Sequence, residues 1–179
     1  MGAELKNVIV FALGGVRHAA ELRWVREVVT LGFVTEIPTA PPGLAGAFNL
    51  RGNLVPVLDI AALTGGVPGP APRQGDGALL VELDGVTAAL RVDKVDEVAT
   101  LGPSIDGKAV LDGRGRTIPL VDPAAVIRRA LAESQAARGD DAEVAPDVPD
   151  LSADGLRPVQ DPTTGARPPL GFDGDLTLG

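Results

Sequence analysis

One histidine and no cysteine limit the chemistry that this 179-residue chain could perform. Without cysteine there is no thiolate nucleophile, no thiolate metal site and no disulfide. A serine–histidine triad would require His18 to reach Ser104, but His18 lies in a predicted strand and Ser104 belongs to the other half of the chain. We therefore expect His18 to be a packed or half-exposed side chain. A zinc site built on several histidines is excluded.

Carboxylates could in principle supply an acid–base pair or an oxygen-ligated ion site. Turn and cap positions explain them more simply, because Asp84 falls in a hairpin turn, Asp122 caps a helix and Asp59 precedes a helical turn. No phosphate-binding loop, dinucleotide fingerprint or calcium-binding loop is present, so we expect no cofactor and no metal. An aspartate-based metal enzyme is the least favoured hypothesis. The carboxylates considered are Asp59, Asp84, Asp93, Asp96, Glu97, Asp106, Asp112 and Asp122.

The stretch 49–59, N-L-R-G-N-L-V-P-V-L-D, places an arginine and a glycine turn directly before an apolar strand. Gly52 permits a tight turn, and Pro56 confines the strand to an edge or a bulge. Arg51 could brace this turn or meet a partner. Its pairing with Glu27 has two open interpretations, a surface ion pair worth less than ~1 kcal/mol or a bridge that fixes a docking surface.

Two β-hairpins are predicted by apolar runs around glycine-containing turns. The first joins Asn7–Leu13 to Val16–Leu22, and the second joins Ala78–Leu83 to Val86–Val92. The other expected elements are an extended segment from Trp24, a short helix at Pro42–Leu50, a helical turn at Ala61–Thr64, a Gly/Pro-rich link at Gly65–Gly77 and a helix at Pro123–Ala137.

An internal repeat connects the two halves of the sequence. Val25–Leu31 matches Val95–Leu101, seventy positions later, in the form V-x-E-V-x-T-L. Arg51–Asp59 matches Arg114–Asp122, sixty-three positions later, in the form R-G-x-x-x-P-x-x-D. Two ordered matches of this kind indicate a duplication, and each half offers the short strands of a small β-barrel.

Composition excludes several classes of function. The net charge of −8 argues against a general nucleic-acid binder, which needs a basic surface. The apolar run Val8–Leu13 is much shorter than the ~20 residues of a membrane span, so we expect a soluble, cytoplasmic protein without direct membrane insertion. Residues 138–179 are rich in proline, glycine and aspartate and are predicted to be a disordered tail.

The chain carries a set of ordered motifs: V-F-A-L-G at 10–14, V-R-E-V at 25–28, Pro38, A-P-P at 40–42, Gly46, N-L-R-G at 49–52, P-V at 56–57, Asp59 and the run 79–101. Together these motifs resemble the CheW-like chemotaxis coupling proteins. The resemblance implies a mainly β fold of two SH3-like five-stranded barrels, over residues 7–137. Lobe 1 is expected at about 7–64 plus returning elements and lobe 2 at about 78–122, followed by the helix 123–137. Lobe 2 is expected to be shortened, because the segment between Leu101 and Thr117 is shorter than is usual in the family.

The resemblance also implies a function without catalysis. It is that of a signal-transduction adaptor, or scaffold, that couples the cytoplasmic tip of chemoreceptors to the regulatory domain of a CheA-type histidine kinase in a two-component system. The protein would then be recruited to membrane-associated receptor arrays. The alternative is a CheW-like scaffold in a non-chemotactic signalling or motility pathway, with the tail recruiting another partner. The protein-binding residues implied by the match are Val25, Glu27, Asn49, Leu50, Arg51 and Gly52.

Overall fold

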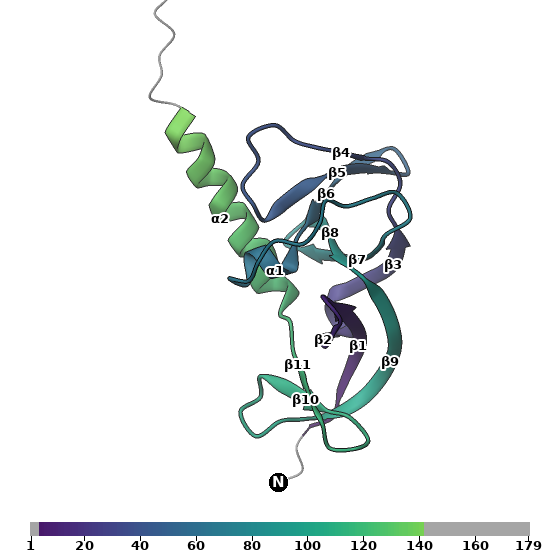
Figure 1. Cartoon of the computed structure of the whole chain (residues 1–179). Helices are drawn as coiled ribbons and strands as arrows, with labels where there is room; N and C mark the ends of the chain where they lie inside the picture. The colour runs from purple at the N-terminus through teal and green to yellow at the C-terminus, as the bar shows by residue number, and fades with distance from the viewer. Residues whose placement is uncertain (1–3, 142–179) are drawn as a thin grey trace, which may run out of the picture. The chain divides into compact units, whose positions relative to one another are not determined.

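The computed structural model describes residues 4–141, which form eleven strands and two α-helices. The expected mainly β fold with a C-terminal helix is confirmed (Figure 1). In chain order the elements are β1 (Lys6–Leu13), β2 (Val16–Glu21), η1 (Leu22–Trp24), β3 (Val25–Thr30), β4 (Val34–Thr35), β5 (Leu44–Leu50), β6 (Asn53–Leu58), α1 (Ile60–Leu63), β7 (Gly77–Leu83), β8 (Val86–Val92), β9 (Lys94–Pro103), β10 (Ala109–Leu111), β11 (Thr117–Pro119) and α2 (Pro123–Asp141).

Both predicted hairpins are present, β1 with β2 and β7 with β8. Their two-residue turns place both central residues at positive φ, +56° and +77° at Gly14 and Gly15 and +50° and +81° at Asp84 and Gly85. This backbone matches the twist of antiparallel strands, and glycine and aspartate tolerate it best. Local turn chemistry therefore fixes these two hairpins.

The first barrel consists of β1, β2, β9, β10 and β11, hydrogen-bonded in the order β11-β10-β9-β1-β2. Ala19 in β2 forms a parallel bridge with Leu120, directly after β11. The peptide N–H of Val121 donates to the Ala19 carbonyl at 2.7 Å. These contacts join the two ends of the sheet and close the barrel.

The second barrel consists of β3 to β8, in the order β3-β7-β8-β6-β5-β4. Strand β6 runs parallel to β8, with Val57 opposite Ala89 and Leu58 opposite Leu90. The chain passes directly from β3 into β4 through three residues, so the two ends of this sheet are consecutive in sequence. In the first barrel the long strand β9 is equivalent to β3 and β4 together, because it pairs with β1 along one part and with β10 along another.

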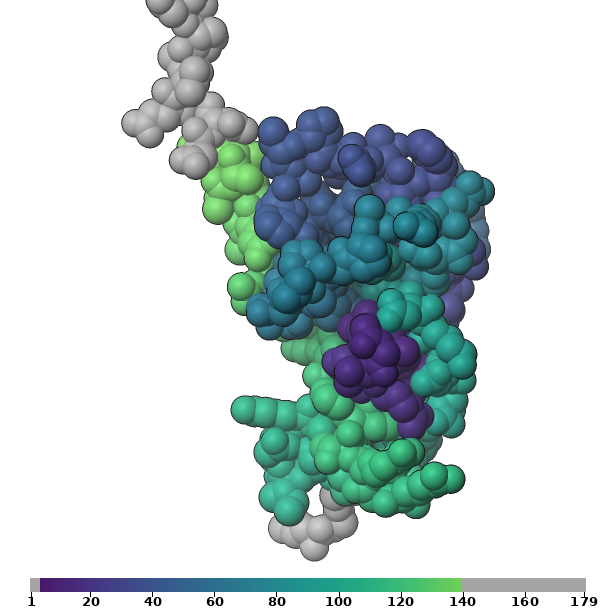
Figure 2. Space-filling model, in the orientation of Figure 1, coloured from purple at the N-terminus to yellow at the C-terminus, as the bar shows by residue number. Residues whose placement is uncertain are grey.

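The lobes were predicted at about 7–64 plus returning elements and at about 78–122. In the structure each barrel takes strands from both halves of the chain. β9 pairs with β1, and β3 pairs with β7 (Figure 1). Figure 2 shows the purple atoms of the N-terminal strands set among teal and green atoms of the C-terminal half. The expected shortening has a counterpart in β10 and β11, which have three residues each where β5 and β6 have seven and six.

The helix predicted at Pro42–Leu50 is wrong, because Leu44–Leu50 is strand β5. Its pairing with β6 across the Arg51-Gly52 turn buries Ala47 and Phe48, and this non-local gain overrides the helix-starting preference of proline. Helix α2 continues to Asp141, past the predicted end at Ala137. The rest of the predicted tail, 142–179, lies outside the described residues.

Three apolar clusters form the core of residues 4–141. The largest lies between the barrels and α2 and includes Phe11, Leu90 and Ile127. The second fills the second barrel around Phe48, and the third fills the first barrel around Val10 and Val110. Over the described part of the chain, no helix is long and apolar enough to cross a bilayer.

Candidate protein-docking site

Arg51 and Gly52 form the two-residue turn between β5 and β6, with φ of +52° and +89°. Both values lie in the left-handed region, as a type I′ turn requires. The Asn49 side-chain oxygen accepts a 2.9 Å hydrogen bond from the Gly52 peptide N–H and stabilises the turn. The turn projects the Arg51 side chain, which is 73% exposed, from the end of the second barrel.

Arg51 forms a two-pronged ion pair with Glu27 on β3. Its Nη1 and Nη2 atoms donate to Glu27 Oε1 and Oε2 at 3.3 Å and 3.1 Å. The predicted Glu27–Arg51 pair is therefore present, whereas its role in docking remains a prediction. A β-bulge at Arg26 shifts the register of β3 just before Glu27, so that two consecutive side chains face the same part of the surface.

This part of the surface is a shallow hollow of about 400 Å³, called here the Arg51 hollow. A second ion pair, Arg26 to Glu82 at 2.6 Å, lies on its rim. Leu54, which lines the hollow, is 75% exposed, and Val28, the residue after Glu27, is also exposed. Apolar contacts bordered by polar groups are typical of protein interfaces. The lining residues are Arg26, Glu27, Leu50, Arg51, Asn53, Leu54, Val55, Leu80, Glu82, Gly85 and Thr87.

The arginine at this turn is not explained by stability. A non-glycine residue in the left-handed region costs about 1 kcal/mol relative to glycine. An exposed ion pair returns ~0.2–1 kcal/mol, so the pair with Glu27 at best offsets the strain. The guanidinium has five N–H donors, and Glu27 engages two of its nitrogens. Arg51 is therefore oriented by Glu27 and retains donors for a partner.

The other predicted site residues are divided between this hollow and its supports. Leu50 lines the hollow, while Asn49 and Gly52 hold the turn that presents Arg51. Val25 lies opposite Val81 and packs against the largest core cluster. The structure therefore separates Val25 from the residues that line the hollow.

Sequence reasoning missed two features of the Arg51 hollow. Leu54 precedes the buried alternate residues Val55 and Val57, and this period-2 pattern could have identified Leu54 as an outward-facing apolar residue. The Arg26–Glu82 pair joins strands 56 positions apart in sequence, since 82 − 26 = 56, and no local signal predicts it. Its detection requires knowledge that β3 pairs with β7.

The repeated turn near Arg114 does not reproduce this site. Asp112 takes the place of Asn49, and its carboxylate accepts the peptide N–H groups of Arg114 and Arg116 at 2.9 Å and 2.8 Å. Glu97, the counterpart of Glu27, pairs with Arg17 at 2.8 Å. The arginine–glutamate pair from the turn is thus a feature of the first repeat.

Most of the carboxylates considered for chemistry have hydrogen-bond or ion-pair partners in the fold. Asp59 is buried and accepts the Ala62 N–H, as expected for a helix cap, and also the Gly69 N–H at 2.7 Å. Asp122 accepts the Ala124 N–H at the start of α2. The turn and cap interpretations of Asp59, Asp84 and Asp122 are confirmed. Within residues 4–141, no three acidic or histidine side chains converge as metal ligands would.

Two turn aspartates are stabilised as anions by hydrogen bonds. The Ser104 hydroxyl, followed by the Lys108 peptide N–H, lowers the pKa of Asp106 below its ordinary value of 3.8. The Arg116 peptide N–H is the main cause that lowers the pKa of Asp112, with help from the Arg114 N–H and the Arg116 guanidinium. Both groups act in turns of the first barrel.

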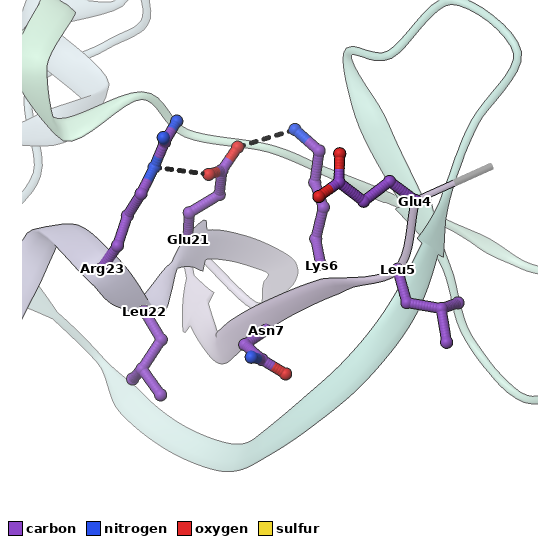
Figure 3. A pocket seen from close by; sticks show the side chains of 7 residues that line it. All are labelled: Glu4, Leu5, Lys6, Asn7, Glu21, Leu22 and Arg23. Atoms are coloured by element: carbon purple, nitrogen blue, oxygen red, sulfur yellow. Dashed lines mark hydrogen bonds and ion pairs between the residues drawn. The ribbon is translucent and has the colours of Figure 1, made fainter.

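A second hollow, of about 640 Å³, lies at the N-terminal end of β1 (Figure 3). Its charged lining side chains are Glu4 before β1, Lys6 on β1, Glu21 at the end of β2 and Arg23 in η1. Glu21 lies between the two cations, 2.6 Å from Lys6 Nζ and 2.7 Å from Arg23 Nε. One carboxylate thus engages both positive charges, and Arg23 also lies over the Trp24 ring at 5.2 Å. Lys6, Glu21 and Arg23 are thus engaged with one another. The Arg51 guanidinium, although paired with Glu27, is 73% exposed and retains N–H donors.

The fold defines the class of protein as a double β-barrel with a C-terminal helix. The CheW-like domain family model matches residues 7–130, and the chain belongs to that family. It is 27% identical over 100 residues to a probable chemotaxis protein CheW of Rhizobium etli, which covers 56% of this chain and 64% of that protein. It is 26% identical over 96 residues to the chemotaxis protein CheW of Rhizobium meliloti, with 54% and 61% covered.

These matches span less than two thirds of the length of both relatives. The structure is similar to the crystal structure of the scaffolding protein TtCheW from Thermoanaerobacter tengcongensis, with a TM-score of 0.56 and 24% sequence identity. This similarity covers 68% of the present chain and 92% of that chain. It supports the two-barrel fold expected from the sequence.

Proposed function

We propose that this chain is a non-enzymatic adaptor of chemotaxis signalling. It joins the cytoplasmic tip of a chemoreceptor to the regulatory domain of a CheA-type histidine kinase and is recruited in this way to membrane-associated receptor arrays. Its membership of the CheW-like family and the chemotaxis names of its relatives support the proposal.

The observation that carries the proposal is the exposed Arg51 guanidinium, held in place by Glu27 and bordered by apolar Leu54. The receptor docks in the Arg51 hollow. The free guanidinium donors bind its carboxylates or carbonyls, and Leu54 supplies apolar contact. Arginine in such a setting is a frequent hot spot, whose truncation costs about 2 kcal/mol or more of binding energy.

The test compares Arg51→Ala with Arg114→Ala, the matched arginine of the second repeat. Capture of a chemoreceptor cytoplasmic fragment by the full chain is measured for both variants, together with the unfolding midpoint. Arg51→Ala is expected to weaken capture at least tenfold while keeping the fold, and Arg114→Ala to leave capture unchanged. Undiminished capture by folded Arg51→Ala contradicts the proposal. Loss of the folded state would instead make Arg51 a structural residue.

A further inference from the structure

The two halves of the chain exchange strands reciprocally. We call residues 4–64 the N-half and residues 77–141 the C-half, joined by the link 65–76. The first barrel combines the β1–β2 hairpin of the N-half with β9, β10 and β11 of the C-half. The second barrel combines the β7–β8 hairpin of the C-half with β3 to β6 of the N-half (Figure 1). Neither half therefore contains a complete barrel.

The exchange has the same register in both directions. In the first barrel Val10 lies opposite Glu97, and in the second barrel Leu80 lies opposite Glu27. Each residue is seventy positions from its counterpart, since 10 + 70 = 80 and 27 + 70 = 97. Both pairings also contain a bulge at the residue that precedes the glutamate, Asp96 in β9 and Arg26 in β3.

The parallel contacts obey the same rule. Ala19 bridges Leu120 in the first barrel, and Ala89 lies opposite Val57 in the second. Again 19 + 70 = 89 and 57 + 63 = 120, the two offsets of the sequence repeat. The halves therefore interact as two copies of one ancestral unit would interact across a two-fold axis.

Each of the three core clusters is shared between the halves. The largest contains Phe11 and Leu58 from the N-half with Leu79 and Ile127 from the C-half. Phe48 of the N-half packs in a cluster with Leu80 of the C-half. Because no cluster belongs to one half alone, each half buries its apolar face only against the other.

The link is tied to the halves by a small set of hydrogen bonds. Leu31 donates its peptide N–H to the Asp76 carbonyl at 2.8 Å and accepts that of Gly75 at 2.9 Å. The link runs outside both barrels, and Asp59 holds it through the Gly69 N–H at 2.7 Å. Arg91 donates a hydrogen bond to the Pro70 carbonyl. Residues 73–75 are exposed, so the link can be cut there while the strand pairings and the shared core still join the halves.

We propose that each half can also pair with the opposite half of a second copy of this chain, through the same surface that it uses within the single chain. Two copies exchange their C-halves and form a dimer that contains two complete double barrels, because every contact of the single chain is available between chains. The Arg51 hollow combines Glu27 and Arg51 of the N-half with Leu80 and Glu82 of the C-half. Each hollow of the dimer is thus built from two copies.

A disulfide can report this exchange, because the natural chain has no cysteine. Asn7 in β1 and Thr100 in β9 lie opposite each other, both exposed, with a 2.7 Å hydrogen bond between their side chains. Opposed residues of antiparallel strands are close enough for a disulfide. The single-chain variant with both Asn7→Cys and Thr100→Cys is expected to close this bond and serves as the geometric control.

The experiment mixes an Asn7→Cys copy with a Thr100→Cys copy. Both are unfolded in denaturant and refolded together at about 1 mM, comparable with the effective concentration that a short link imposes. We expect a disulfide between the copies in a species of dimer mass. The matched control replaces Thr100→Cys with Thr30→Cys, the equivalent position of β3, which does not face Asn7.

In a second experiment the link is cut, so that it no longer favours pairing within one chain over pairing between copies. A protease site is inserted between Arg73 and Gln74 in the full chain, and the folded protein is cut before mixing. The two pieces are expected to remain together as a 1:1 complex and, after joint refolding, to form the Asn7–Thr100 cysteine bond between copies. Pieces that separate after cutting overturn the proposal. So does a missing bond in either experiment while the double variant closes its own, or an equal yield with the Thr30→Cys copy.

Discussion

Glu97 on β9 pairs with Arg17 on β2 at 2.8 Å, although the repeat predicts a partner in the turn at Arg114. Arg17 also lies 3.4 Å from Asp96 and 3.9 Å from Asp112. Arg17 in the first barrel thus lies near three carboxylates. It takes the place that Arg51 has in the second barrel, because it pairs with Glu97 as Arg51 pairs with Glu27. The duplication conserved the strands and altered the electrostatics.

Arg17→Ala is expected to destabilise the fold by about 1–2 kcal/mol, as a charge-assisted hydrogen bond is lost and three like charges remain together. The Nε atom of Arg17 is buried without a hydrogen bond, so its removal offsets part of this loss. Urea unfolding measures the loss. Arg17→Lys is the control, and it should recover part of the stability because it keeps the charge without the planar fork. An unchanged midpoint in Arg17→Ala would show that the cluster is neutral for stability.

Arg51→Gly is expected to separate stability from binding. Glycine removes the left-handed strain of about 1 kcal/mol, while loss of the Glu27 pair costs ~0.2–1 kcal/mol. The unfolding midpoint should therefore stay the same or rise, while capture of the chemoreceptor fragment falls as in Arg51→Ala. A clear drop of the midpoint would mean that Arg51 stabilises the turn more than its exposed geometry implies.

Local signals predicted the local parts of the fold. Gly14-Gly15 and Asp84-Gly85 identified both hairpins, because two residues that tolerate positive φ select the turn type. The repeat likewise identified the matching strands. The partner of each strand could not be predicted, because V-x-E-V-x-T-L fits either hairpin equally well, and the choice depends on how the two halves bury their shared core.

The same distinction applies to the site. The Glu27–Arg51 pair was predicted from residue types and from the resemblance, and it is present. The Arg26–Glu82 pair depends on the pairing of β3 with β7 and could not be predicted. The Pro42–Leu50 helix was wrong for a related reason, because the burial of Phe48 in a sheet outweighed the local preference.

Acid should weaken the β10–β11 turn through Asp112. Its pKa is lower in the folded chain than the ordinary 3.8, so its anion stabilises the fold above the unfolded pKa. This contribution is lost as the pH falls from about 4 through the folded pKa.

The measurement is the difference in unfolding free energy between the natural chain and Asp112→Asn, across pH 7 to about 2.5. Asparagine keeps an acceptor for the peptide N–H groups, as Asn49 does in the other half, but cannot titrate. The difference should be largest near neutral pH and shrink in acid. A difference that does not change with pH would contradict the assignment of the turn to the ionised carboxylate.

Gly43→Ala is expected to destabilise the fold where the chain enters β5, because Gly43 lies against Leu63 of α1 and Glu133 of α2. A Cβ at residue 43 would overlap Leu63 Cδ2 and would lie 3.0 Å from Glu133 Oε2. Leu63 is 2% exposed, so it can move aside only by disturbing the largest core cluster. Overpacking of this kind costs about 1–3 kcal/mol, which urea unfolding can resolve.

Gly32→Ala is the matched control, because no atom lies within 4 Å of a Cβ there. Its effect should stay within about 0.5 kcal/mol. A second comparison makes the steric cause testable, since in a Leu63→Ala background the same Gly43→Ala change should cost much less than in the natural chain. Equal costs in the two backgrounds would exclude the Leu63 contact as the reason for glycine at this position.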